Sequence, residues 1–193
     1  MRVLAVPCLL SALILAACTA DSPPPPQLMT PSVAEGALPL NARRLEIIEN
    51  WKMPIEPPYI GHLRQPYPGN LVSQWATRTL VPAGGSGELI LDITRAAVTK
   101  VKLPREVGLT NALTDQQDAE IKVEFEAQLM WLQPVGGSQA MIKLAASHAV
   151  TIPESSSAND VQRAVNECLN AALEGLDRQA RIELDKLDNV ILP

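Results

Sequence analysis

Histidine, cysteine and carboxylate side chains are the groups with which this sequence could do acid–base, nucleophilic or metal chemistry. His148 falls in an alternating run between Ala146 and Val150, a position typical of a core or edge histidine rather than a ligand. His62 lies in a proline-rich stretch. No spacing of His, Cys, Asp and Glu matches the ligand patterns of metal sites. We therefore expect no metal ion, no cofactor and no catalytic residues.

Three further features resemble enzyme motifs only superficially. The "GGSG" segment at residues 84–87 follows a predicted helix and precedes a predicted strand, whereas phosphate loops run from strand to helix. Ser86 lacks the G-x-S-x-G context of a nucleophile elbow. Glu124 and Glu126 share the polar face of one predicted strand, where neighbouring carboxylates usually serve solubility. The sequence thus predicts a protein that is not an enzyme, with an enzyme of unknown class left as an alternative.

The N-terminal stretch has the pattern of a targeting segment. A single basic residue, Arg2, precedes an apolar run of about 13 residues, which is shorter than the roughly 20 that span a bilayer. Small residues, Ala16 and Ala17, follow the run and precede Cys18. This pattern is typical of a secretory signal, so we predict a signal peptide over residues 1–17.

The residues Leu15-Ala16-Ala17-Cys18 resemble the lipobox of bacterial lipoproteins at every position. The resemblance implies that Cys18 is diacylated on its sulfur, becomes the new N-terminus and is acylated again, so that its acyl chains, such as palmitate, anchor the chain to a membrane. Thr19, and not Asp, follows the cysteine, which by the enterobacterial sorting rule implies the outer membrane, facing the periplasm, over the inner membrane. An ordinary secretory signal that happens to contain a cysteine is the alternative.

Of the other cysteines, Cys8 lies in the predicted signal peptide and Cys168 in the last predicted helix. With Cys8 removed and Cys18 lipidated, Cys168 has no internal disulfide partner. Its helical context favours a buried small apolar side chain, and a reactive thiol is the alternative.

Composition excludes several classes of partner. The formal net charge is −5 and no basic block occurs, so binding to nucleic acid, or to anionic headgroups by charge alone, is not expected. Aromatic side chains, on which sugars and single-stranded nucleic acids stack, are scarce: three Trp, two Tyr and one Phe. We instead expect a membrane partner through the acyl chains and a protein partner in the envelope, with a bound lipid as a further possibility.

The periodicity of apolar residues predicts the elements that carry these side chains. Residues 18–40 contain four consecutive prolines from Pro23, and we predict that they form a lipidated cysteine followed by an extended tether. Residues 41–193 are predicted to form one α+β domain. The predicted order is β-α-β-β-β-α, an antiparallel sheet of about four strands with two helices on one face. The strands are expected at 43–51, 88–103 (with a bulge), 119–132 and 140–152, and the helices at 71–80 and from a Ser157–Asp160 capping box to about residue 186.

Two loops are candidate partner surfaces. The first, residues 51–68, combines five prolines with Trp51, Tyr59, His62 and Tyr67. It is either a segment that packs over a sheet edge or a rigid surface for a partner, and the two are compatible. The second, residues 104–118, places Leu109 and Leu113 in a polar setting and is longer than a hairpin needs, so it is either a packed loop or a contact loop.

The lipobox, proline-rich tether and small domain with a long last helix resemble auxiliary lipoproteins of ABC-type lipid transport systems and the lipoprotein partner of the lipopolysaccharide-assembly barrel. The stretch "GHLRQPYPGNLVSQW" at residues 61–75 is similar to a group of alphaproteobacterial lipoproteins. These resemblances imply a non-enzymatic accessory or scaffold subunit of an envelope transport or assembly system. The alternative is a carrier that holds a lipid or other apolar ligand between the sheet and the last helix.

Overall fold

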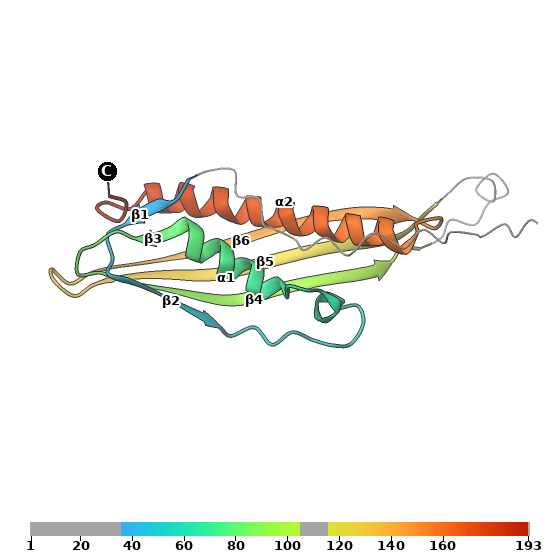
Figure 1. Cartoon of the computed structure of the whole chain (residues 1–193), viewed down its shortest axis with the longest axis horizontal. Helices are drawn as coiled ribbons and strands as arrows, with labels where there is room; N and C mark the ends of the chain where they lie inside the picture. Colours follow the sequence, from blue (N-terminus) through green and yellow to red (C-terminus); the bar gives the residue numbers. More distant parts are fainter. Residues whose placement is uncertain (1–35, 105–115, 193) are drawn as a thin grey trace, which may run out of the picture.

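The computed structural model describes residues 36–104 and 116–192. Its main layer is a long four-stranded sheet, and both α-helices lie on one face of it (Figure 1). The α+β class and the two helices on one face are therefore confirmed. The elements in chain order are β1 (Leu38–Leu40), β2 (Arg44–Glu49), a 3-10 helix η1 (Gly61–Leu63), α1 (Pro68–Thr79), β3 (Leu80–Pro82), β4 (Glu88–Lys102), β5 (Gln117–Gln133), β6 (Ser138–Pro153) and α2 (Ala158–Asp185).

The strand order in the large sheet is β2-β4-β5-β6. Strands β4, β5 and β6 pair antiparallel, but β2 pairs parallel with β4, so the sheet is mixed and not antiparallel throughout as predicted. The reason is the connection: the chain leaves β2, returns along α1 and enters β4 in the same direction, as β-α-β crossovers do (Figure 1). Periodicity along each strand does not carry this information.

A small second sheet joins the two ends of the domain. Strand β1 pairs parallel with β3, and Leu38 lies opposite Leu80. The C-terminal residues pair with the same segment, because Leu192 N donates to Pro39 O at 2.8 Å and Ile191 bridges to Leu40. Residues 38–40 fall at the end of the range predicted as tether, and in the structure they belong to the folded part.

The buried face of the sheet follows the period-2 pattern. In β5, Ile121, Val123, Phe125, Ala127 and Leu129 are all buried beneath the helices. The bulge expected in β4 is present between Ile93 and Arg95. It changes which side chains face inward. Ala96 and Val98 lie opposite the buried Phe125 and Val123 of β5, so Ala97 and Val101, which unbroken alternation from Leu89 would place on that face, point to the other face.

The long helix α2 begins at the predicted capping box. Asp160 N donates to Ser157 Oγ at 3.2 Å, and Ser157 N donates to Asp160 Oδ2 at 3.0 Å. Gly175 allows α2 to approach β6 closely, because a Cβ at this position would lie 3.2 Å from Ala146 Cβ on β6. No described helix is both long and apolar enough to cross a membrane.

A buried polar cluster ties α1 to α2. Trp75 Nε1 donates to Asp177 Oδ1 at 2.8 Å, and Arg181 Nε donates to Asp177 Oδ2, also at 2.8 Å. Arg181 Nη2 donates in turn to Gly36 O at 2.8 Å. The carboxylate is 5 % exposed, and its partners satisfy the hydrogen bonds that a buried charge requires. The cluster is therefore structural, and it also holds the first described residue of the chain.

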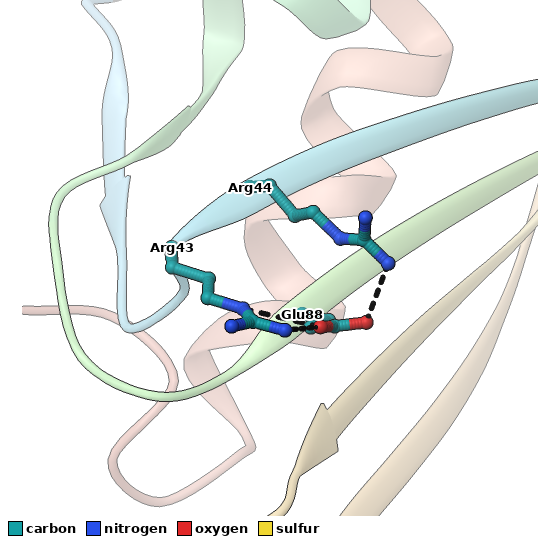
Figure 2. Close-up of polar contacts among 3 residues, drawn as sticks. All are labelled: Arg43, Arg44 and Glu88. Atoms are coloured by element: carbon teal, nitrogen blue, oxygen red, sulfur yellow. Dashed lines mark hydrogen bonds and ion pairs between the residues drawn. The ribbon is translucent and has the colours of Figure 1, made fainter.

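An ion-pair cluster joins the starts of β2 and β4 (Figure 2). Arg43 and Arg44 point to the Glu88 carboxylate from consecutive positions. Arg44 Nη2 donates to Glu88 Oε2 at 2.9 Å, and Arg43 binds the other oxygen. Hydrogen bonds from Arg43 and then Arg44 lower the pKa of Glu88, because both stabilise its ionised form.

Candidate protein-binding surface at the sheet edges

The outer side of β4 is covered by other segments of the chain. Strand β2 pairs with the first half of β4, and residues 58–60 continue along the second half, where Ile60 N donates to Val98 O and Lys100 N donates to Pro58 O, each at 2.9 Å. The proline-rich loop therefore packs over a sheet edge, as one of its two interpretations predicts. A partner that adds a strand would find this part of the edge occupied.

The candidate residues Trp51 and Tyr59 lie together beside this edge. Their ring centroids are 6.4 Å apart, and the Arg95 guanidinium carbon lies 5.3 Å from the Trp51 ring centroid. Arg95 Nη2 also contacts Glu124 Oε2 at 2.9 Å, and Lys122 Nζ contacts Glu124 Oε1 at 2.8 Å. These hydrogen bonds, from Lys122 first and then Arg95, lower the pKa of Glu124. The cluster bridges the proline-rich loop and the helix-free face of the sheet.

The other candidate residues lie elsewhere. His62 is in η1, and Tyr67, 41 % exposed, is the residue that precedes α1. Between them, Arg64 donates to Asn166 Oδ1 of α2 at 2.6 Å, which fixes this part of the loop against α2. The structure thus brings Trp51 and Tyr59 together. Cys18, Leu109 and Leu113 lie outside the described residues.

The opposite edge of the sheet, β6, is open in the part of the chain that the structure describes. Strand β6 is 16 residues long and pairs on one side only, with β5. Ala145 N points away from β5, because it donates to Gln179 Oε1 of α2 at 2.6 Å. Since strand residues alternate, the N–H groups of Lys143, Ser147 and Ala149 point the same way, and no described residue accepts from them.

The side chains along this edge are short. Ala145, Ser147, Ala149 and Thr151 are all exposed on the helix-free face. Between residues 139 and 152 the strand carries one charged residue, Lys143, and it has no proline and no register shift there. Charged side chains, prolines and bulges are the features with which edge strands usually block further pairing, and β6 has only Lys143 among them between residues 139 and 152. The edge is therefore chemically able to take another strand.

A hollow of about 170 Å³ lies next to the open edge on the helix-free face. Its floor comes from β5 and β6, and its lining residues are Glu124, Phe125, Glu126, Ala145, Ala146 and Ser147. The hollow exists because small side chains on β6 lie beside two carboxylates on β5. Glu124 is paired as described above, whereas Glu126 is exposed and makes no ion pair with any described residue.

Sequence reasoning identified β6 but did not identify its edge as a candidate site. The signal was present in part: between residues 139 and 152 the polar face of the predicted strand is rich in Ala, Ser and Thr and carries only one charge. The sequence does not show the order of the strands in the sheet. Which strand is outermost depends on pairing between segments that are far apart in the chain.

Cys168 and His148, the other residues considered for chemistry, lie within the described part of the fold. Cys168 is fully buried, as favoured from the sequence, and its burial raises the pKa of the thiol to about 11. His148 lies opposite Val123 on the helix-facing side of β6, half-buried. Among residues 36–104 and 116–192, no group of three or more His, Cys, Asp and Glu side chains could hold a metal ion.

Comparison with known proteins finds likeness only among solved structures, since no protein-family model and no curated protein matches the sequence significantly. A minor lipoprotein from Acinetobacter baumannii aligns over 80 % of this chain and 99 % of its own, at 9 % identity and a TM-score of 0.41. The rare lipoprotein B from Shewanella oneidensis aligns over 73 % of this chain and 96 % of its own, at 13 % identity and a TM-score of 0.37. At TM-scores below 0.5 these likenesses carry no conclusion about function.

Proposed function

We propose that this chain is a lipid-anchored, periplasm-facing lipoprotein of the outer membrane that serves as a non-enzymatic accessory or scaffold subunit of an envelope transport or assembly system. Its contact with protein is made by strand addition at the edge of β6. The observation that carries this proposal is the open edge: β6 is 16 residues long and, among the described strands, pairs only with β5, whereas β2 at the opposite edge is six residues long. The lipobox residues that end at Cys18 support the anchor.

Packing between α2 and the sheet favours this function over that of an apolar-ligand carrier. Cys168, Leu169, Ala172 and Leu176 are each at most 1 % exposed and fill the space that a carrier would keep for its ligand. Gly175 lies against β6 as well, which brings the helix backbone close to the strand. A ligand between these layers would have to displace a close-packed core.

The anchor is tested by labelling cells that express the full chain with radioactive palmitate. We expect label in the wild-type protein and none after Cys18→Ser, because the acyl chains of the proposed anchor are attached at Cys18. The Cys168→Ser variant is the matched control and should keep the label. Label that persists after Cys18→Ser would overturn the anchor.

Strand addition is tested with a photo-crosslinking amino acid at position 149 of the lipidated protein in its own envelope. We expect a crosslinked peptide that maps to an extended segment, from whichever chain supplies the strand. Ser147→Pro should remove this crosslink because it deletes an outward N–H, whereas Ser147→Ala, which keeps the N–H, should leave it unchanged. A crosslink that is equally strong in the proline variant would refute docking at this edge.

A further inference from the structure

We infer that the strand added to β6 is β6 of a second copy of this chain, paired antiparallel about a two-fold axis at Leu144, so that the two large sheets become one. The inference rests on the proposed function, whose docking edge it uses, and it names the partner. A two-fold axis perpendicular to the sheet keeps the helix-free faces on the same side, and therefore each side chain of one edge meets a side chain of the same face of the other.

The backbone groups fit this arrangement. The outward N–H and C=O groups of β6 belong to odd-numbered residues, as the outward Ala145 N–H shows. An axis at Leu144 places Lys143 opposite Ala145 of the second copy and Met141 opposite Ser147, so that odd residues meet odd residues and exchange hydrogen bonds. The Gln179 side chain that now accepts from Ala145 N–H is on a flexible stem, and a carbonyl of the second strand would replace it.

Charge selects the register. Within one copy, Ala145 lies beside Glu126 on β5, Ser147 beside Glu124, and Ala149 beside Lys122. Lys143 of a second copy, opposite Ala145, would stand about two strand spacings, roughly 10 Å, from β5, and the long Lys side chain can cross the small Ala145 to reach Glu126. By symmetry the pair forms twice.

Neighbouring registers are less favourable. An axis at residue 143 would place the two Lys143 side chains directly opposite each other, and an axis at residue 146 would place Lys143 next to Lys122 in the adjoining row. An axis at residue 145 would bring Lys143 to Glu124, which Arg95 and Lys122 already bind. Of the axes from residue 143 to residue 146, only the one at Leu144 directs Lys143 to a carboxylate that has no ion pair among the described residues.

Apolar side chains border the same edge. Met141 on the helix-free face is 62 % exposed, and Ile182 of α2 is 58 % exposed. Ile182 lies two helical turns after Gly175, the residue of α2 that closely approaches Ala146 of β6. Pairing two copies about Leu144 would bring apolar groups from both faces toward the axis and remove part of their surface from water.

Charge reversal tests the inference with full-length, lipidated protein that is expressed with two different tags and purified in mild detergent. We expect wild-type copies to co-purify, and either Glu126→Lys or Lys143→Glu alone to lower co-purification about tenfold, because each places like charges at both symmetric contacts. The double variant Glu126→Lys/Lys143→Glu should restore it. Glu46→Lys, on the exposed face of β2 at the other end of the sheet, is the control and should have no effect.

The register is tested by cysteine pairs in the envelope. Residues 141 and 147 of two paired copies would have Cα atoms about 5.5 Å apart, within the range that a disulfide bridges. Co-expressed Met141→Cys and Ser147→Cys chains should therefore form a disulfide-linked dimer, and the pair Met141→Cys with Ala149→Cys, displaced by two residues, should form far less.

Failure of this inference and failure of the proposed function are distinguishable. Wild-type copies that do not co-purify, or a dimer that charge reversal leaves unchanged, would overturn the second copy as partner. If the crosslink at position 149 then maps to another protein and disappears in Ser147→Pro, the proposed function stands with a different strand donor. Rescue by the double charge reversal, together with the 141–147 disulfide, would establish the dimer.

Discussion

At the scale of single residues, the polar groups that the structure buries hold elements together. Asp177 accepts hydrogen bonds from Trp75 of α1 and from Arg181 one turn further along α2. Cys168 is similarly enclosed, and the raised pKa of its thiol keeps it protonated at neutral pH. Asp177 and Cys168 therefore both contribute to the packing between elements.

Asp177→Ala should lower the free energy of unfolding by about 3 kcal/mol, because it leaves the Trp75 indole N–H and a largely buried Arg181 without this carboxylate. Urea unfolding followed by tryptophan fluorescence measures the change. Asp185→Asn, on the exposed end of the same helix, is the control and should alter stability by less than about 0.5 kcal/mol. Equal stability of the two variants would show that the buried cluster contributes little.

At the scale of elements, local sequence signals and the structure agree best where an element carries its own boundary. Helix α2 begins at Ser157 because its side chain and Asp160 satisfy each other's free backbone N–H groups. Strand β5 is equally clear from the sequence, because its apolar and polar residues alternate. Strands β1 and β3, each three residues long, have no such signal. They form because two segments that are far apart in the chain pair with each other there.

Ser157→Ala should destabilise the domain by about 1 kcal/mol through loss of the N-cap hydrogen bond. Circular dichroism during thermal unfolding should show a lower midpoint with an unchanged folded spectrum. Ser156→Ala, one residue earlier and outside the capping box, should unfold as the wild type does. A larger loss in Ser156→Ala than in Ser157→Ala would contradict the assignment of the cap.

At the scale of the whole molecule, acidic side chains in ion pairs tie the sheet across its width. Glu88 joins β2 to β4, and Glu124 joins β5 to Arg95 on β4, which in turn lies over Trp51. Both carboxyls have pKa values below their usual range because their partners favour the ionised form. These pairs connect the proline-rich loop and β2 to the meander formed by β4, β5 and β6.

The free energy of unfolding should therefore decrease as the pH is lowered into the acid range. A carboxyl whose pKa is lower in the folded than in the unfolded state adds stability above its unfolded pKa, near 4, and loses it as the pH falls through the folded value. The free energy of unfolding should be nearly constant from about pH 7 to about pH 5 and then fall. Urea titrations at each pH measure this dependence.

The variant Glu88→Gln/Glu124→Gln should be less stable at neutral pH and should show a shallower decline in acid. The loss from Glu124 should not exceed about 1 kcal/mol, because its ion pairs are partly solvent-exposed. Glu46→Gln removes a carboxyl that forms no ion pair with a described residue and should keep the wild-type profile. An unchanged profile in the double variant would place the acid-sensitive groups elsewhere.

The sequence by itself determined the fold class, the positions of helices α1 and α2 and of strands β4, β5 and β6, the bulge in β4 and the α2 cap. Each of these depends on residues close together in the chain, whose spacing is set by the periods of helix and strand. The lipobox resemblance at Cys18 is local in the same way, and it remains a prediction.

Only the tertiary structure decided that β2 runs parallel to β4, that residues 58–60 cover part of the outer side of β4, and that β6 pairs with no described strand other than β5. Strand order and direction depend on contacts between residues far apart in the chain. Apolar and polar residues alternate in the same way in an edge strand as in an inner strand with one exposed face, so the pattern does not distinguish the two. The candidate binding surface is therefore a property of the assembled sheet. No single segment of the sequence could have revealed it.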